Sequence, residues 1–266
     1  MNNQPIGILD SGVGGLSIWK EVLSQLPNES TVYIGDSLHA PYGKRHADEI
    51  FRLARQLVAF LVAKQVKLVV VACNTITVNS IGNLRAAFPT MPIIGTVPVV
   101  KLAVHTTKNK RIGLLATSAT VNSTYNKNLI ATFAGDCTVI TIGTDTLVPL
   151  IEQGREKQLV VALKKELKPF IDNHIDTIIL GSTHFPLIRE HIQKIMGANV
   201  HILDSGGAVA RQVKRVLENN KTSGSAKRSS HLLYTTGSKA PFIAMLKRVV
   251  GNDRKDMVES VQAITL

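Results

Sequence analysis

The chain has 266 residues, of which 44% are hydrophobic and 19% charged, so it can bury a sizeable core as one large domain or two of moderate size. It has no run of about eighteen uncharged apolar residues and no secretion signal, so we expect neither a membrane span nor export. Two cysteines give no disulfide framework, which fits a cytoplasmic protein.

The net charge of +12 is high, but no aromatic residues interleave the basic clusters at 108–111 and 221–228, so we expect only weak, non-specific binding to nucleic acid.

Strand and helix patterns alternate along the chain. Short apolar runs predict strands at residues 6–9, 31–34, 67–72, 92–95, 111–116, 138–142, 177–181 and 200–203. Helical periodicity predicts helices at 17–26, 47–65 and 78–88, and further helices that begin at Thr120, Leu147, Gln158 and Leu187. This alternation is typical of parallel sheets with helices on both faces. Residues 222–230 are predicted to form a loop, 231–250 resume the strand and helix patterns, and 253–266 are poor candidates for the core.

Two pairs of segments resemble each other within the chain. Residues 5–11 (Pro-Ile-Gly-Ile-Leu-Asp-Ser) match residues 111–117 (Arg-Ile-Gly-Leu-Leu-Ala-Thr). Residues 67–75, a strand run that ends in Cys-Asn-Thr, match residues 176–184, which end in Ser-Thr-His. Both pairs occur in the same order at similar offsets, so they predict two related α/β lobes with a cleft between them. We assign residues 1–97 and 207–266 to the first lobe and 98–206 to the second.

Polar residues follow the predicted strands, at the edge of a parallel sheet where ligands bind. A thiol at such a place suits proton transfer, because its pKa responds to hydrogen-bonding neighbours. His184 ends an apolar strand and precedes a Phe-Pro turn, which favours an acid/base or orienting role over a structural one. Asp10 precedes a serine at the expected cleft, which favours a site role over helix capping.

Two other kinds of site are disfavoured. The glycine-rich loop at residues 10–16 has neither the G-x-G-x-x-G spacing nor the Gly-Lys-Ser/Thr ending of phosphate loops, so we expect its amides to hold a carboxylate instead of a nucleotide. The histidines show no H-x-x-x-H or H-E-x-x-H spacing and the cysteines lie far apart, so no metal site is predicted. Cys137 has no partner motif and is interpreted as structural.

Taken together, the motifs resemble those of the glutamate racemases, in the aspartate/glutamate racemase superfamily. The matching pieces are residues 9–16, 35–36 with 41–43, 72–75 and 181–186, and the resemblance runs from about residue 5 to 250. It implies two pseudo-symmetric α/β lobes, each a mainly parallel sheet flanked by helices, with the active site in the cleft between them. It also implies interconversion of L- and D-glutamate for peptidoglycan synthesis by two-base proton transfer, with no cofactor and no metal, in a homodimer.

The resemblance also assigns the site residues. Cys73 and the residue at position 182 are the two proton-transfer groups, and Asp10 and His184 assist them. The substrate-binding residues implied are Ser11, Pro41, Tyr42, Gly43, Asn74, Thr75, Thr117, Thr120, Glu152 and Thr183.

One departure stands out, because the family motif Gly-Cys-Thr-His reads Gly-Ser-Thr-His here, with Ser182 in place of the second cysteine. A serine hydroxyl is a far weaker acid than a thiol and supplies almost no alkoxide at neutral pH, so it cannot readily replace a thiolate base, although His184 could assist it. We therefore expect impaired racemisation. The serine is compatible with an engineered replacement, with a naturally altered racemase, or with a single-thiol relative that resembles the arylmalonate decarboxylases. A non-enzymatic binding protein with a basic surface is the alternative from another class.

Overall fold

The computed structural model describes residues 2–224, 229–251, 257 and 260–266, and the chain divides into two compact units. Residues 1–96 with 206–266 form unit 1, and residues 97–205 form unit 2. Part of the expected loop at 222–230 and of its basic cluster, residues 225–228, lies outside the described residues.

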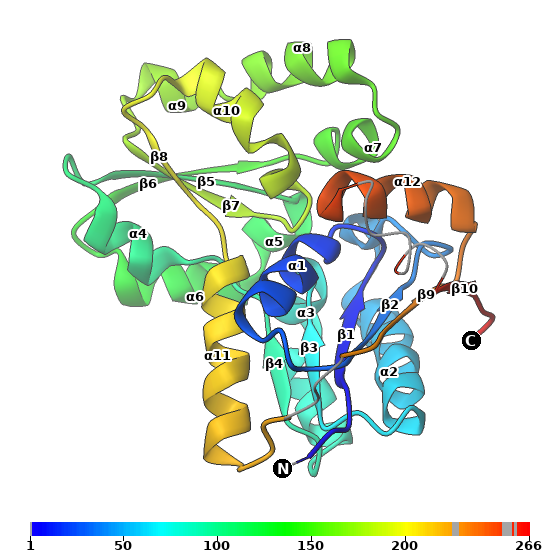
Figure 1. The fold of residues 1–266 in the computed structure, drawn as a ribbon. Helices are drawn as coiled ribbons and strands as arrows, with labels where there is room; N and C mark the ends of the chain where they lie inside the picture. The colour runs from blue at the N-terminus through cyan, green and yellow to red at the C-terminus, as the bar shows by residue number, and fades with distance from the viewer. Residues whose placement is uncertain (1, 225–228, 252–256, 258–259) are drawn as a thin grey trace. The chain divides into compact units, whose positions relative to one another are not determined.

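Unit 1 is built on a six-stranded parallel sheet with the order β10-β9-β2-β1-β3-β4. Its strands are β1 (Ile6–Asp10), β2 (Thr31–Gly35), β3 (Leu68–Val71), β4 (Ile93–Gly95), β9 (His231–Thr235) and β10 (Val261–Ala263). Its helices are α1 (Leu16–Gln25), the 3-10 turn η1 (Tyr42–Lys44), α2 (Ala47–Ala63), α3 (Asn74–Ala87), α11 (Gly206–Asn219) and α12 (Lys239–Val250). Helices α1 and α11 pack together on one face of this sheet, and α2 and α3 pack together on the other (Figure 1).

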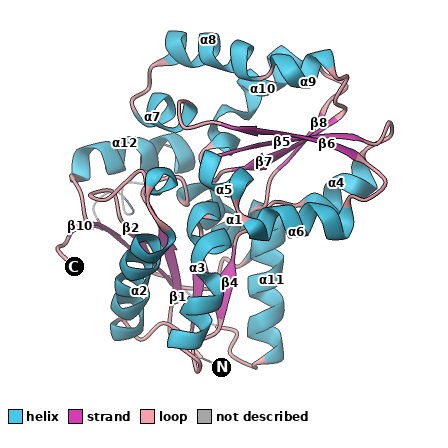
Figure 2. Ribbon diagram, turned by 180° about the vertical axis from the view of Figure 1, so that it is seen from behind, coloured by secondary structure: helices cyan, strands magenta, loops and turns pink. Residues whose placement is uncertain are grey.

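Unit 2 is built on a four-stranded parallel sheet with the order β6-β5-β7-β8. Its strands are β5 (Arg111–Ala116), β6 (Thr138–Gly143), β7 (Thr177–Gly181) and β8 (His201–Leu203). Its helices are α4 (Val100–Thr106), α5 (Ser118–Asn122), α6 (Thr124–Phe133), α7 (Leu147–Glu152), α8 (Glu156–Glu166), α9 (Lys168–Asp172), the 3-10 turn η2 (Phe185–Ile188) and α10 (Arg189–Met196). Figure 2 shows α4 and α6 on one face of the sheet and α8, α9 and α10 on the other.

The two sheets share a strand order and a register. The run β2-β1-β3-β4 corresponds to β6-β5-β7-β8, with β1 and β5 as the equivalent inner strands. Leu9 of β1 pairs with Val71, and Leu115 of β5 pairs with Leu180. Both sheets are buried at these strands, which explains why their sequences read as continuous apolar runs without alternation. The predicted α/β class with parallel sheets is confirmed.

Three local predictions need correction. Helix α3 begins at Asn74, not at Val78, because its first four residues are all buried and so show no amphipathic period. The helix expected from Thr120 is divided into α5 and α6, since the Ser123 hydroxyl accepts the Asn126 amide and starts a second helix. The C-terminal stretch does contribute to the core, because Met257 and Val261 are 1% and 3% exposed and β10 extends the sheet beside β9.

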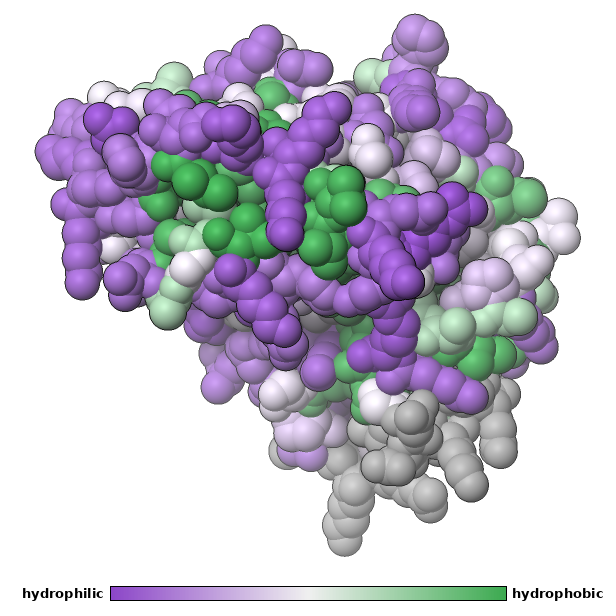
Figure 3. All heavy atoms as spheres, turned by 90° about the horizontal axis from the view of Figure 1, so that it is seen from above, coloured by the Kyte–Doolittle hydropathy of each residue, from purple (hydrophilic) through white to green (hydrophobic). Residues whose placement is uncertain are grey.

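No helix among the described residues is long and apolar enough to span a membrane. The face drawn in Figure 3 is mainly hydrophilic, with hydrophobic residues gathered in smaller areas.

Candidate active site

Two of the predicted site residues in unit 1, Asp10 and Cys73, lie at the carboxyl ends of β1 and β3. Asp10 is the last residue of β1, and Cys73 follows β3 and directly precedes α3. These strands are neighbours in a parallel sheet, so their carboxyl ends meet at the same edge. Asp10 is fully buried and Cys73 is 5% exposed. The sheet therefore places a carboxylate and a thiol together in surroundings that hold little water.

The Cys73 thiol is held in its protonated form. Burial and the nearby Asp10 carboxylate raise its pKa to about 12, although hydrogen bonds from Ser11 and from the backbone amide of Ile76 oppose the shift. The Sγ atom lies 3.4 Å from the Ser11 hydroxyl oxygen. Cys73 can act as a base only after something else takes its proton, and Asp10 is the charged group next to it.

The glycine-rich loop packs against these strand ends. Asp10 accepts the Gly12 amide at 3.0 Å and does not cap α1, which begins at Leu16. A Cβ on Gly15 would lie 2.7 Å from the Asp10 Cβ and 3.0 Å from that of Ala72. Gly15 thus permits the close approach of the loop to the ends of β1 and β3.

The next residues begin α3 and the loop after β2. Asn74 and Thr75 are 3% and 5% exposed, and Asn74 Nδ2 donates to the Thr96 carbonyl at 3.3 Å. Tyr42 is buried and its hydroxyl donates to Asp36 at 2.6 Å. On either side of Tyr42, Pro41 is exposed and Gly43 is half-buried.

In unit 2, most of the predicted site residues follow β5 and β7. Ser182 and His184 are each 6% exposed, and the Ser182 hydroxyl accepts the His184 amide at 3.4 Å. His184 Nε2 lies 2.8 Å from a carboxylate oxygen of Glu152, at the end of α7. This contact makes Glu152 an orienting partner for the histidine.

The two threonines expected after β5 also lie together. The Thr117 and Thr120 hydroxyls are 3.0 Å apart, and the Thr117 hydroxyl accepts the Thr120 amide at the start of α5. Thr183 is 5% exposed, between Ser182 and His184. Each strand end of unit 2 thus presents small polar side chains, as in unit 1.

Comparison with known proteins identifies the family. The family model for the Asp/Glu/Hydantoin racemases matches residues 6–213. A glutamate racemase from Shewanella halifaxensis is 40% identical over 245 residues, which are 90% of this chain and 91% of the relative. The chain belongs to this racemase family. The resemblance inferred from the sequence motifs is therefore confirmed.

Solved structures of the family agree with the fold. A glutamate racemase isoform from Bacillus anthracis matches with a TM-score of 0.91 and 32% identity, covering 100% of this chain and 99% of that one. A glutamate racemase from Francisella tularensis, solved in complex with D-glutamate, matches with a TM-score of 0.87 and 29% identity, covering 100% and 98%.

Several polar residues near the strand ends were not on the expected list. Asp36 follows β2, and its buried carboxylate accepts the hydroxyls of Tyr42 and Thr236. Thr144 takes the equivalent place after β6 and donates to Glu166 at 3.1 Å. Two signals in the sequence pointed to Asp36: its position directly after a strand and its place in the motif at residues 35–36 that contributes to the family resemblance. Thr236 gave no signal, since it lies 200 residues away from Asp36 along the chain.

The described residues hold no cluster of three or more His, Cys, Asp and Glu side chains that could bind a metal ion. Cys137, half-buried before β6, packs against the apolar cluster of unit 2.

Proposed function

We propose that this protein interconverts L- and D-glutamate by direct proton transfer at the α-carbon, without a cofactor, and so supplies D-glutamate for peptidoglycan. The observation that carries the proposal is that Cys73 and Ser182 hold equivalent positions beyond equivalent strands, each in a polar motif. Membership of the racemase family and the activity named for the relatives support it. The residues Cys73, Ser182, Asp10 and His184 are proposed to carry the proton transfers.

The α-proton of an amino acid is a very weak acid, so the reaction needs a base held against it and a site that stabilises the carbanion. On one face of the substrate, Cys73 is the proposed base. Its raised pKa means that a proton must leave the thiol first, and we assign Asp10 as the group that takes part in that transfer.

On the other face, the proposed proton-transfer group is Ser182, assisted by His184 and Glu152. The His184–Glu152 contact orients the imidazole. Because a serine hydroxyl yields almost no alkoxide at neutral pH, inversion is expected to be slow compared with proton exchange on the Cys73 face.

The remaining polar residues are proposed to bind glutamate. Hydroxyl, amide and backbone N–H groups can donate hydrogen bonds to the carboxylates, and these bonds tighten as charge develops, while hydroxyl, carbonyl and carboxylate oxygens can accept from the ammonium group. The proposed set is Ser11, Pro41, Tyr42, Gly43, Asn74 and Thr75 of unit 1 with Thr117, Thr120, Glu152 and Thr183 of unit 2. We further propose a cytoplasmic homodimer whose basic surface binds nucleic acid only weakly and loses it as salt rises.

Calorimetry with each enantiomer tests this function. The purified chain is expected to bind D- and L-glutamate at micromolar to millimolar concentration, and Cys73→Ala to bind them while exchanging no α-proton with solvent deuterium. Aspartate and a nucleotide serve as comparison ligands. The proposal fails if neither glutamate enantiomer binds while a nucleotide does, or if an arylmalonate loses carbon dioxide on this protein while glutamate is unchanged.

A further inference from the structure

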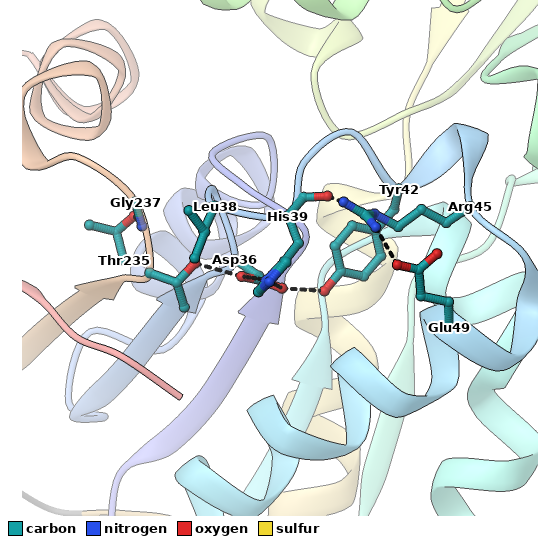
Figure 4. Close-up of polar contacts among 9 residues, drawn as sticks. Asp36, Leu38, His39, Tyr42, Arg45, Glu49, Thr235 and Gly237 are labelled. Carbon is teal, nitrogen blue, oxygen red and sulfur yellow. Dashed lines mark hydrogen bonds and ion pairs between the residues drawn. The ribbon is translucent and has the colours of Figure 1, made fainter.

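The carboxylate of Asp36 brings together side chains from two distant parts of unit 1. Asp36 follows β2 and is 2% exposed. Tyr42 donates its hydroxyl to Oδ2 at 2.6 Å, and Thr236 donates its hydroxyl to Oδ1 at 2.5 Å. His39 Nδ1 lies 2.9 and 3.0 Å from the two oxygens. Figure 4 shows Asp36 between the Tyr42 ring and the segment that follows β9.

The loop from β2 to α2 is tied down at both ends. At its start, the Leu38 amide donates to the Thr236 hydroxyl at 3.1 Å, so Thr236 holds the loop as well as Asp36. At its end, Arg45 Nε donates to the His39 carbonyl at 2.8 Å, and the guanidinium pairs with Glu49 of α2 (Figure 4). The segment Pro41–Gly43 lies between these ties.

Tyr42 connects the loop with the proposed base. Its ring is 1% exposed and belongs to the same apolar cluster as Cys73 and Ile76 of α3. Burial and the Asp36 carboxylate raise the pKa of its hydroxyl, so it stays a protonated donor. The hydroxyl is thus engaged by Asp36, and the buried ring anchors η1 against α3, the helix that begins directly after Cys73.

We propose that Asp36, completed by Thr236, is a positioning residue that fixes the segment Tyr42–Gly43 for substrate binding. This inference rests on the proposed function of that segment. A buried carboxylate is stable only when its oxygens are hydrogen-bonded, so the loop is held in the one arrangement that provides these partners. A loop that is already ordered before the ligand binds loses little conformational entropy on binding, and the affinity is higher for that reason. Thr236 therefore serves the site from the last part of the chain.

The experiment measures the affinity for D-glutamate by calorimetry on the full chain and on variants of the network. Removing one hydrogen bond to a charged, buried oxygen is expected to weaken binding about tenfold in Thr236→Val and in Tyr42→Phe. Thr236→Ser keeps the hydroxyl and is expected to bind within about twofold of the parent protein. The fold decrease in affinity of the double variant should be smaller than the product of the two single decreases, because both substitutions act through the Asp36 carboxylate.

Thr31→Val is the matched control. Thr31 starts β2 at the end opposite Asp36, is 1% exposed, and its hydroxyl bonds Trp19 Nε1 at 2.9 Å and His231 at 3.0 Å. Loss of the Thr31 hydroxyl should lower the melting temperature and leave the affinity for glutamate unchanged. Equal weakening by Thr31→Val and Thr236→Val would overturn the inference in favour of general stability, as would unchanged affinity in Thr236→Val and Tyr42→Phe. Failure of the parent protein to bind glutamate would instead overturn the proposed function.

Discussion

Cys73 and Ser182 occupy equivalent positions in the two sheets, in which the run β2-β1-β3-β4 corresponds to β6-β5-β7-β8. Leu9 of β1 pairs with Val71 of β3, and Leu115 of β5 pairs with Leu180 of β7. Cys73 lies two residues after Val71, and Ser182 lies two residues after Leu180. One position carries a buried thiol beside a carboxylate, and the other carries a hydroxyl beside a histidine. The pseudo-symmetric fold thus presents two chemically unequal groups at matched places.

The first prediction concerns the Cys73 thiol. With its pKa raised to about 12, Cys73 should be almost entirely protonated at neutral pH, with roughly a thousandfold less thiolate than an ordinary cysteine. In a Cys137→Ser background, the rate of alkylation by iodoacetamide is expected to keep rising with pH beyond about 10. Asp10→Asn removes the carboxylate that helps to raise the pKa, so it should speed alkylation at any given pH below that range. A plateau below pH 9 in the parent protein would contradict the assignment.

The sequence predicted most of the fold because its strands are short, apolar and regularly separated by helices. It failed where burial removes the pattern: the first turn of α3 is buried on every side, and β10 is a three-residue strand at the sheet edge whose last two residues are exposed. Such a strand is recognisable only from its partner β9.

The proposed site residues were predictable where they lie at or just beyond strand ends, as Asp10, Cys73 and Ser182 do. Their partners were not predictable from spacing. Glu152 reaches His184 from a separate helix, and Thr236 reaches Asp36 from a strand end far along the chain. Tertiary contacts of this kind leave no periodic signal, and only the family resemblance assigned Glu152 to the site.

The second prediction tests Glu152 as the partner of His184. Glu152→Gln replaces the carboxylate that orients the His184 ring with a weaker, neutral acceptor, so it should slow inversion of glutamate by roughly tenfold or more. Exchange of the α-proton on the Cys73 face of the substrate should change little. Glu156→Gln is the control, because its His191 contact is on the surface, with 27% and 61% of the two side chains exposed. Equal slowing of exchange and inversion in Glu152→Gln would argue against the assignment.

The third prediction concerns the buried ion pair at the other end of the unit 1 sheet. The Lys67 side chain is 1% exposed, and its Nζ bonds Glu29 at 2.5 Å and the carbonyls of Asn2 and Thr222 at 2.8 Å each. Lys67→Met leaves the carboxylate buried without this partner and should lower the free energy of unfolding by about 3–5 kcal/mol. Denaturation followed by fluorescence of the single, buried Trp19 reports on this unit.

A surface pair gives the comparison for Lys67. Lys168 and Asp172 form an ion pair with side chains 69% and 52% exposed, so Lys168→Met should cost less than about 1 kcal/mol. Adding Glu29→Gln to Lys67→Met should recover part of the lost stability, because the unpaired buried charge is removed. If Lys67→Met lowers the free energy of unfolding only slightly, as expected for Lys168→Met, the buried pair contributes little beyond its desolvation cost.

The last prediction concerns Ser182 itself. A thiol ionises far more readily than a hydroxyl, so Ser182→Cys should provide the missing proton-transfer group on the second face. A positioned general acid or base contributes about 10²–10⁴-fold, and the variant should racemise glutamate faster than the parent protein by that order. The parent protein should still exchange the α-proton of one enantiomer through Cys73. Deuterium incorporation and optical rotation, followed in the same samples, separate exchange from inversion. Exchange without inversion in the parent, with inversion gained in Ser182→Cys, is the expected result. Equal racemisation by both proteins would mean that Ser182, activated by His184 and Glu152, is already a competent second group.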